Sequence, residues 1–120
     1  IACTGFELAH PFFDKKFLNY TEGPVPLYLK MFHAEYDNLY FIGMFQPLGC
    51  IWPGAEQQSI LATLALKGLW KRPSNMKDLC EREVTNPHMK QINTSRHRIT
   101  VDFHQFLKDL KKQIKKVKKI

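Results

Sequence analysis

The spacing of apolar residues predicts helices in the second half of the chain. One side of a helix over residues 103–117 carries the apolar residues Phe103, Phe106, Leu107, Leu110, Ile114 and Val117. Lysines occupy its other sides, and Asp102 and Gln105 form a capping-box pattern at its start. This amphipathic helix is predicted to pack on its own domain; a membrane surface or a partner helix are the alternatives.

Two further helices are predicted upstream of this one. Pro53 suits the first position of a helix, and a helical pattern covers Ala55 to Trp70. Apolar residues lie around most of the circumference of this segment, which predicts a helix buried inside the protein. Ser74 is a candidate cap for a helix from about Asn75 to Val84.

Short apolar segments in the first half predict strands. Ile1 to Phe6 is read as the end of a buried strand, Leu27 to Phe32 as a short strand, and Leu39 to Gly43 as a strand rich in β-favouring residues. Strand, glycine loop and buried helix then follow one another between residues 39 and 68, as in a βα unit. The predicted fold class is α/β, with short strands, a buried helix and amphipathic C-terminal helices.

Composition narrows the class of protein. The chain has 120 residues, enough for one domain. Its longest apolar run, Ile60 to Leu66, is far below the roughly 20 residues of a membrane-spanning helix, so no transmembrane segment is predicted. The three cysteines form no Cys-x-x-Cys pair, which argues for a reducing, cytoplasmic location and against a metal site.

The positive charge is concentrated at one end of the chain. The formal net charge is +7, and residues 108–119 hold seven lysines and one aspartate, or +6. The rest of the chain is close to neutral, unlike a domain that binds nucleic acid along a whole face, so no nucleic-acid partner is expected. The alternative is a small basic module that binds nucleic acid or an anionic membrane surface through the Lys-rich C-terminal helix.

Four segments carry motifs. Residues 2–6 read Ala-Cys-Thr-Gly-Phe, residues 27–32 read Leu-Tyr-Leu-Lys-Met-Phe, and residues 46–49, after Ile-Gly, read Gln-Pro-Leu-Gly. Residues 96–103 read Arg-His-Arg-Ile-Thr-Val-Asp-Phe. In this order they resemble the C-terminal part of animal-type flavin-containing monooxygenases over nearly the whole chain. Cys3 and Phe6 depart conservatively from that pattern, and residues 1–120 do not include the hydrophobic tail of such members.

The resemblance implies that residues 1–120 are the C-terminal portion of a flavoprotein with two dinucleotide-binding domains. They would comprise the end of an NADPH-domain strand and then a returning FAD-domain strand and helices. No three glycines match Gly-x-Gly-x-x-Gly, so both FAD and NADPH would need the missing N-terminal part. We therefore expect the chain alone to be inactive and to self-associate through exposed edges. A half-enzyme completed by a separate chain is the remaining alternative.

The intact enzyme implied by the resemblance oxygenates a soft nucleophile, an amine nitrogen or a sulfide sulfur. FAD, reduced by NADPH, would capture O₂ as a flavin C4a-hydroperoxide and pass one oxygen atom to the substrate, so no catalytic side chain is expected in this segment. The resemblance assigns cofactor binding to Thr4, Gly5, Gly43, Gln46, Gly49 and Gln58.

Overall fold

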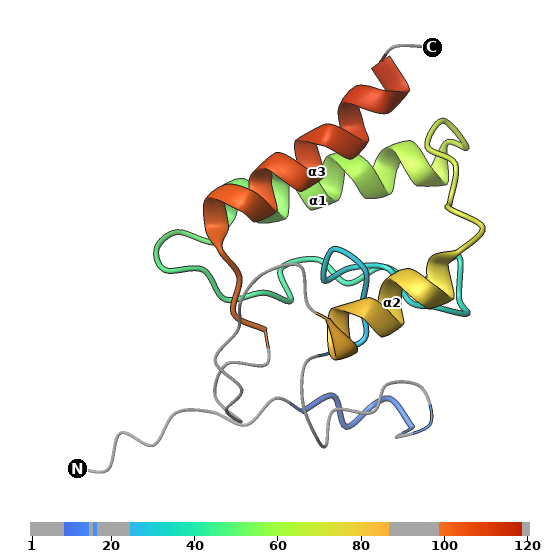
Figure 1. Ribbon diagram of the computed structural model, residues 1–120, viewed down its shortest axis with the longest axis vertical. Helices are drawn as coiled ribbons and strands as arrows, with labels where there is room; N and C mark the ends of the chain where they lie inside the picture. Colours follow the sequence, from blue (N-terminus) through green and yellow to red (C-terminus); the bar gives the residue numbers. More distant parts are fainter. Residues whose placement is uncertain (1–8, 15, 17–24, 87–98, 119–120) are drawn as a thin grey trace.

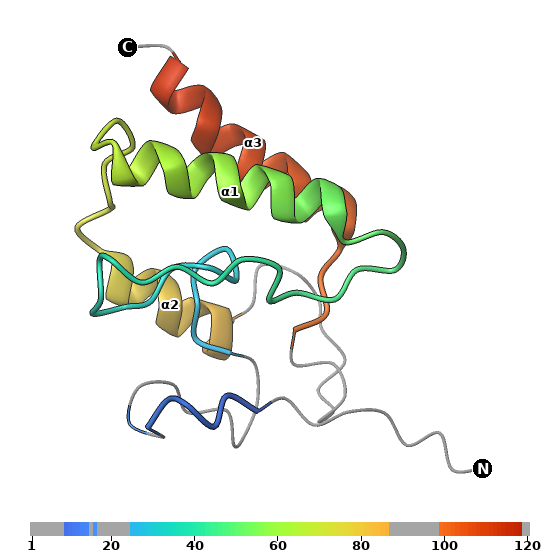
Figure 2. The same ribbon diagram turned by 180° about the vertical axis from the view of Figure 1, so that it is seen from behind.

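Three helices and the loops that join them make up the described part of the protein in a computed structural model (Figure 1). The structure describes residues 9–14, 16, 25–86 and 99–118. The helices are α1 (Trp52–Leu66), α2 (Met76–Thr85) and α3 (Phe103–Lys118). α1 and α3 lie side by side as one layer, and α2 lies on the other side of the molecule with the loops of residues 25–50 (Figures 1 and 2).

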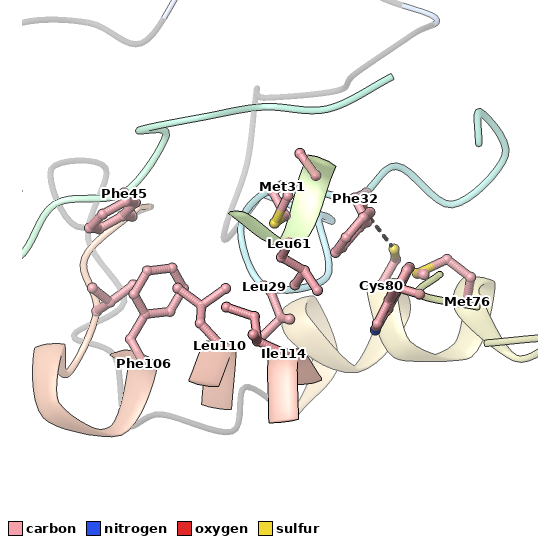
Figure 3. Close-up of a cluster of buried hydrophobic side chains, with 13 residues drawn as sticks. Leu29, Met31, Phe32, Phe45, Leu61, Met76, Cys80, Phe106, Leu110 and Ile114 are labelled. Atoms are coloured by element: carbon pink, nitrogen blue, oxygen red, sulfur yellow. Dashed lines mark hydrogen bonds between the residues drawn. The ribbon is translucent and has the colours of Figure 1, made fainter. Parts of the chain in front are cut away.

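The main hydrophobic core fills the space between these two layers (Figure 3). Helices and loops both contribute buried side chains to it, among them Leu29, Met31, Phe32, Phe45, Leu61, Met76, Cys80, Phe106, Leu110 and Ile114. The rings of Phe45 and Phe106 lie 4.6 Å apart between their centroids. Since Phe45 precedes α1 and Phe106 is in α3, this ring pair joins the loop before α1 to the last helix.

The predicted C-terminal helix is confirmed. Its stripe of apolar residues faces the core, where Phe106, Leu110 and Ile114 are buried. The backbone N–H of Gln105 donates to Oδ1 of Asp102 at 3.1 Å, as the capping pattern predicts. α2 lies one residue later at each end than predicted, and Asn75, not Ser74, is its N-cap. None of the helices in the described part of the chain is long and apolar enough to cross a membrane.

α1 begins and ends at residues with clear local roles. Pro53 lies in its first turn, as predicted. The helix ends at Leu66, four residues earlier than predicted, because Gly68 adopts a left-handed φ of 68°. The N–H of Leu69 donates to the carbonyl of Leu64 at 2.9 Å, and that of Gly68 to the carbonyl of Ala65 at 2.9 Å. These two bonds form a Schellman motif, which closes the helix.

Burial of α1 differs from the prediction. Its buried residues lie on a single side of the helix: Gly54, Gln58, Leu61 and Ala62. On the other side Trp52 is 75% exposed and Leu66 is 71% exposed. The prediction of a helix buried all round is therefore wrong for the described residues, because α3 and the core cover only one side of α1.

The predicted strands at 27–32 and 39–43 are also wrong. Within the described residues the backbone forms isolated bridges, which pair Tyr28 with Phe32, Phe32 with Tyr40, and Gln46 with Thr100. The described part of the fold is therefore helices joined by bridged loops, and the α/β class is not confirmed. The predicted strand at residues 1–6 lies outside the described residues.

A tight turn explains why residues 27–32 do not extend. Leu29 and Lys30 both adopt left-handed conformations, with φ of 53° and 55°. Two consecutive left-handed residues reverse the chain, so that the N–H of Phe32 donates back to the carbonyl of Tyr28 at 3.0 Å. Such residues are costly unless surrounding contacts hold them. The apolar pattern shows that this segment is buried, and it does not show that the segment turns.

Gly54 allows α1 to approach the core closely. A Cβ added at this position would lie 2.3 Å from Cζ of the buried Phe45 ring. Gly54→Ala is therefore expected to destabilise the protein by about 1–2 kcal/mol. With two ring atoms this close, overpacking should cost about 2–3 kcal/mol, the upper part of its usual range, and the helix propensity of alanine recovers about 1 kcal/mol. Urea denaturation followed by circular dichroism measures this. The matched control is Thr63→Ala, at an exposed α1 position; a stabilised Gly54→Ala variant would contradict the prediction.

Candidate functional site

The structure brings together two of the six predicted site residues. The backbone N–H of Gly43 donates to Oε1 of Gln58 at 2.8 Å, which joins the loop before α1 to the buried side of that helix. Gln46 and Gly49 lie farther along the same loop and are exposed. Thr4 and Gly5 lie outside the described residues. The assignment of all six to cofactor binding stays a prediction.

Gln58 acts within the protein in this structure. Its side chain is fully buried, and its Nε2 donates to the carbonyl of Leu29 at 3.1 Å while its Oε1 accepts from Gly43. Both ends of the amide are thus used, and they connect α1 to the left-handed turn and to the Gly43 loop. Gln58 is therefore suited to position Gly43, with no free polar atom directed at a ligand.

Gly43 and Gly49 expose bare backbone near the start of α1. Gly43 has a φ of 77°, and a Cβ added to it would meet only Cδ1 of Ile51, at 4.0 Å. Gly49 has a φ of 125° with no neighbouring atom in the place of a Cβ. At both positions the backbone conformation, rather than lack of space, favours glycine. The loop therefore leaves room at its surface beside Gly43.

Gln46 anchors this loop through its backbone. Its N–H donates to the carbonyl of Ile99 at 2.7 Å, and its carbonyl accepts from the N–H of Val101 at 3.1 Å. These bonds tie the loop to the segment that leads into α3. The side chain of Gln46 is exposed and can contact a ligand.

A cleft of about 550 Å³ lies between α2, α3 and the left-handed turn. At its edge Nζ of the buried Lys30 pairs with Oε2 of Glu83 at 3.4 Å. Gln113 donates from Nε2 to the hydroxyl of Tyr28 at 3.0 Å. Burial raises the pKa of the Tyr28 hydroxyl, and the nearby carboxylates of Asp109 and Glu83 raise it further. Tyr28 therefore stays protonated at neutral pH.

Comparison with known proteins places the chain in a family. A sequence profile described as flavin-binding monooxygenase-like matches residues 1–120. The chain belongs to that family. Flavin-containing monooxygenase 5 of Rattus norvegicus is 33% identical over 114 residues, which cover 92% of this chain and 21% of the rat protein.

Two shorter matches agree with this family. Dimethylaniline monooxygenase (N-oxide-forming) 2 of Rattus norvegicus is 37% identical over 87 residues, 68% of this chain and 16% of that protein. Flavin-containing monooxygenase 2 of Homo sapiens gives the same identity and the same coverage. The chain thus spans about a fifth, or less, of the length of these relatives. The family resemblance read from the sequence motifs is confirmed.

The residues present fit part of a flavin site. A flavin is the cofactor of this flavin-binding family. Gly43 and Gly49 present backbone without side chains, which a flat ring system can approach closely. The sequence has no Gly-x-Gly-x-x-Gly turn to hold a diphosphate. These residues therefore fit one wall of a flavin site and not a complete site.

The sequence did not reveal the Lys30–Glu83 pair. The two residues are 53 positions apart, and nothing in the local pattern of either indicates the other. The one indication in the sequence was that Lys30 lies within the apolar segment 27–32, because a buried lysine needs a partner of opposite charge. Among the described residues, no three His, Cys, Asp or Glu side chains gather in a way that would hold a metal ion.

Glu83→Gln is expected to destabilise the protein by about 2–3 kcal/mol. It leaves the buried Lys30 without its counter-charge, which costs about 3–5 kcal/mol in a fully buried pair and less here because Glu83 keeps some exposure. The double variant Lys30→Met with Glu83→Leu should recover most of this loss. Urea denaturation measures each variant. Glu81→Gln, on the exposed side of the same helix, is the control; equal losses for Glu81→Gln and Glu83→Gln would contradict the prediction.

Proposed function

We propose that this chain is the C-terminal portion of a monooxygenase that uses FAD and NADPH to oxygenate a soft nucleophile, an amine nitrogen or a sulfide sulfur. Membership of the flavin-binding monooxygenase-like family over residues 1–120 is the observation that carries the proposal. The names of the relatives, flavin-containing monooxygenase and dimethylaniline monooxygenase, support this reaction class. Transfer of one oxygen atom of O₂ to the substrate, with the flavin reduced by NADPH as the activating group, is part of the proposal, as the family resemblance implies.

In this proposal the segment supplies one wall of the FAD site. Gly43 lets the flavin approach the loop before α1, and Gln58 holds that loop in place through the Gly43 N–H. Gln46 and Gly49 lie on the exposed part of the same loop and contact the cofactor. Thr4 and Gly5 contribute from the first residues of the chain. The flavin supplies the oxygen chemistry, and these residues orient it and exclude water.

The remaining assignments follow from this one. The chain alone lacks a diphosphate-binding turn and is expected to be inactive. The dinucleotide-binding domains, and the binding of NADPH, belong to the rest of the enzyme. A cytoplasmic location, contact of the lysines of α3 with an anionic membrane, and self-association of the fragment stay predictions of the sequence. The comparisons do not favour the alternative of a basic module.

The test uses the chain by itself and a chimera. In the chimera, residues 1–120 replace the matching segment of Dimethylaniline monooxygenase (N-oxide-forming) 2 of Rattus norvegicus, whose name gives the substrate and the product of the assay. Titration with FAD, followed by flavin fluorescence, should show no binding to the chain alone. The chimera should retain FAD and oxidise NADPH in the presence of dimethylaniline with formation of the N-oxide. Stoichiometric FAD binding by the folded chain alone, or a folded chimera without flavin, would contradict the proposal.

Two glycine variants of the chimera test the site itself. Gly43→Val should lower the flavin content, because it strains the loop and places methyl groups beside the flavin wall. Gly68→Val is the matched control, because Gly68 has a similar left-handed φ, 68° against 77°, but lies at the other end of α1. Equal flavin content in the two variants would remove Gly43 from the site.

A further inference from the structure

The outward sides of α1 and α3 differ in chemistry although the two helices lie side by side (Figures 1 and 2). Both helices bury one side in the same core. The outward side of α3 is basic and carries the exposed residues Lys108, Lys111, Lys112, Lys115 and Lys116. The outward side of α1 carries Trp52, Glu56, Ser59, Ile60, Thr63 and Leu66, which we name the outer stripe. Glu56 is the only charged residue of the outer stripe.

The outer stripe is even less polar than its residue types indicate. Trp52 is 75% exposed, Ile60 39% and Leu66 71%. The hydroxyl of Ser59 donates to the carbonyl of Ala55 at 2.8 Å, and that of Thr63 to the carbonyl of Ser59 at 2.8 Å. Because both hydroxyl groups donate to backbone carbonyls of the same helix, neither O–H points to solvent. A helix that is apolar on both sides is normally covered on both sides.

The extent of the family match indicates what covers it. Residues 1–120 match the family throughout, yet the chain equals 21% of the length of Flavin-containing monooxygenase 5 of Rattus norvegicus. About four-fifths of such an enzyme therefore lies outside this segment. The outer stripe is also continuous with the loop of the proposed FAD site, since Trp52 follows that loop directly and Leu48 within it is 96% exposed.

We propose that the outer stripe of α1 is an internal interface, covered by the remaining part of the monooxygenase chain. This inference rests on the proposed function. The cover begins beside Leu48 at the flavin wall and runs along α1 to Leu66, so the contact that buries Trp52 also closes the cofactor site. Docking thereby couples burial of α1 to exclusion of water from the flavin.

The charge of the outer stripe favours a protein segment over an anionic lipid surface as its occupant. An anionic membrane attracts lysine and arginine. Within α1 the outer stripe has neither, and its one charge is the carboxylate of Glu56; a cation beside it, the exposed Lys67, lies at the C-cap. The lysines that such a membrane would attract lie on α3. A stripe with three exposed apolar side chains and a single carboxylate fits a protein interface, in which few charges need pairing.

The experiment measures how fast a thiol on the outer stripe reacts with N-ethylmaleimide. Thr63→Cys places the thiol in the middle of the stripe, and Lys111→Cys places the matched control on the exposed side of α3. Each variant is prepared in the 120-residue chain and in the rat chimera, and labelling is quantified by peptide mass spectrometry, which separates it from the native exposed Cys50. Thr63→Cys should react at least roughly tenfold more slowly in the chimera than in the chain alone, with Lys111→Cys unchanged.

Several results would overturn the inference. Equal rates for Thr63→Cys in chain and chimera would show that the stripe stays open. Protection in the chain alone that grows with its concentration would assign the stripe to a second copy. Protection by phosphatidylserine vesicles alone would assign it to lipid. Flavin content is recorded separately. A flavin-loaded chimera with an unprotected Thr63→Cys refutes the interface and keeps the proposed function. A chimera that protects Thr63→Cys but holds no flavin keeps the interface and contradicts the proposed function.

A second measurement needs only the chain itself. The double variant Trp52→Arg with Leu66→Lys removes the apolar character of the outer stripe. Because both side chains are exposed, the variant should keep the circular dichroism spectrum and urea midpoint of the parent chain and bind less of the apolar dye ANS. If the variant unfolds, the outer stripe is part of the core of the chain, and the inference is wrong.

Discussion

Gln58→Met is expected to lower the free energy of unfolding by about 4 kcal/mol, because it leaves two backbone groups without partners at about 1–3 kcal/mol each. The groups are the N–H of Gly43 and the carbonyl of Leu29, which the amide of Gln58 joins at 2.8 and 3.1 Å. Methionine has a similar volume, so the packing changes little. Urea denaturation followed by circular dichroism measures the loss, which is large for a domain whose total stability is about 5–15 kcal/mol.

The control for this prediction is the adjacent residue. Gln57→Met makes the same chemical change at a half-buried position in α1. It should alter the free energy of unfolding by about 0.5 kcal/mol or less. If Gln58→Met were as stable as Gln57→Met, the buried amide would not hold the Gly43 loop, and its positioning role in the proposed FAD site would be lost.

Phe106→Ala is expected to destabilise the protein by about 3–5 kcal/mol, the usual cost of removing a fully buried aromatic side chain. Phe106 is 1% exposed, and its ring contacts the ring of Phe45 at 4.6 Å between centroids. Because Phe45 also packs on Gly54 of α1, the cavity would lie where the two helices and the loop before α1 meet. Thermal and urea denaturation of the 120-residue chain measure the effect.

Two further variants serve as controls for Phe106→Ala. Phe106→Leu keeps much of the apolar volume and should lose about 1–2 kcal/mol. Phe103→Ala removes a half-buried ring from the same helix and should cost less than Phe106→Ala. Similar losses for Phe103→Ala and Phe106→Ala would show that the contact with Phe45 does not organise the core.

The last helix was predictable because its determinants are local. Asp102 and Gln105 mark its start, and Phe106, Leu110 and Ile114 recur at helical spacing on one side. The start of α1 was predictable for the same reason, through Pro53. Its end was missed, since the apolar pattern continues to Trp70 while the left-handed Gly68 closes the helix at Leu66.

The strand predictions failed because apolar residues in the first half report burial and not conformation. Residues 27–32 are buried as the pattern indicates, except for the half-buried Tyr28. The reversal at Leu29 and Lys30, however, depends on contacts with Gln58 and Glu83. Those partners lie on two different helices, so no window of sequence around the turn contains the information. Short apolar segments cannot be assigned by periodicity alone.

The candidate site was predictable only as a set of motifs. The resemblance assigned Gly43 and Gln58 to cofactor binding, which stays a prediction; the structure joins the two residues by a hydrogen bond. It did not distinguish Gln58, whose amide is used inside the protein, from Gln46, whose side chain is exposed. The cleft beside Lys30 and Glu83 was missed because its lining comes from α2, α3 and a distant turn.

The left-handed turn at Leu29 and Lys30 determines when this part of the chain folds. Each of these residues costs about 1–2 kcal/mol in its left-handed conformation. The local hydrogen bonds between Tyr28 and Phe32 offset part of that cost. The remaining stabilisation comes from contacts with Gln58, 29 positions after Leu29, and with Glu83, 53 positions after Lys30. We therefore expect the turn to become stable only once α1 and α2 are in place, late in folding. We expect substitutions that weaken the turn to accelerate unfolding and to leave the folding rate nearly unchanged.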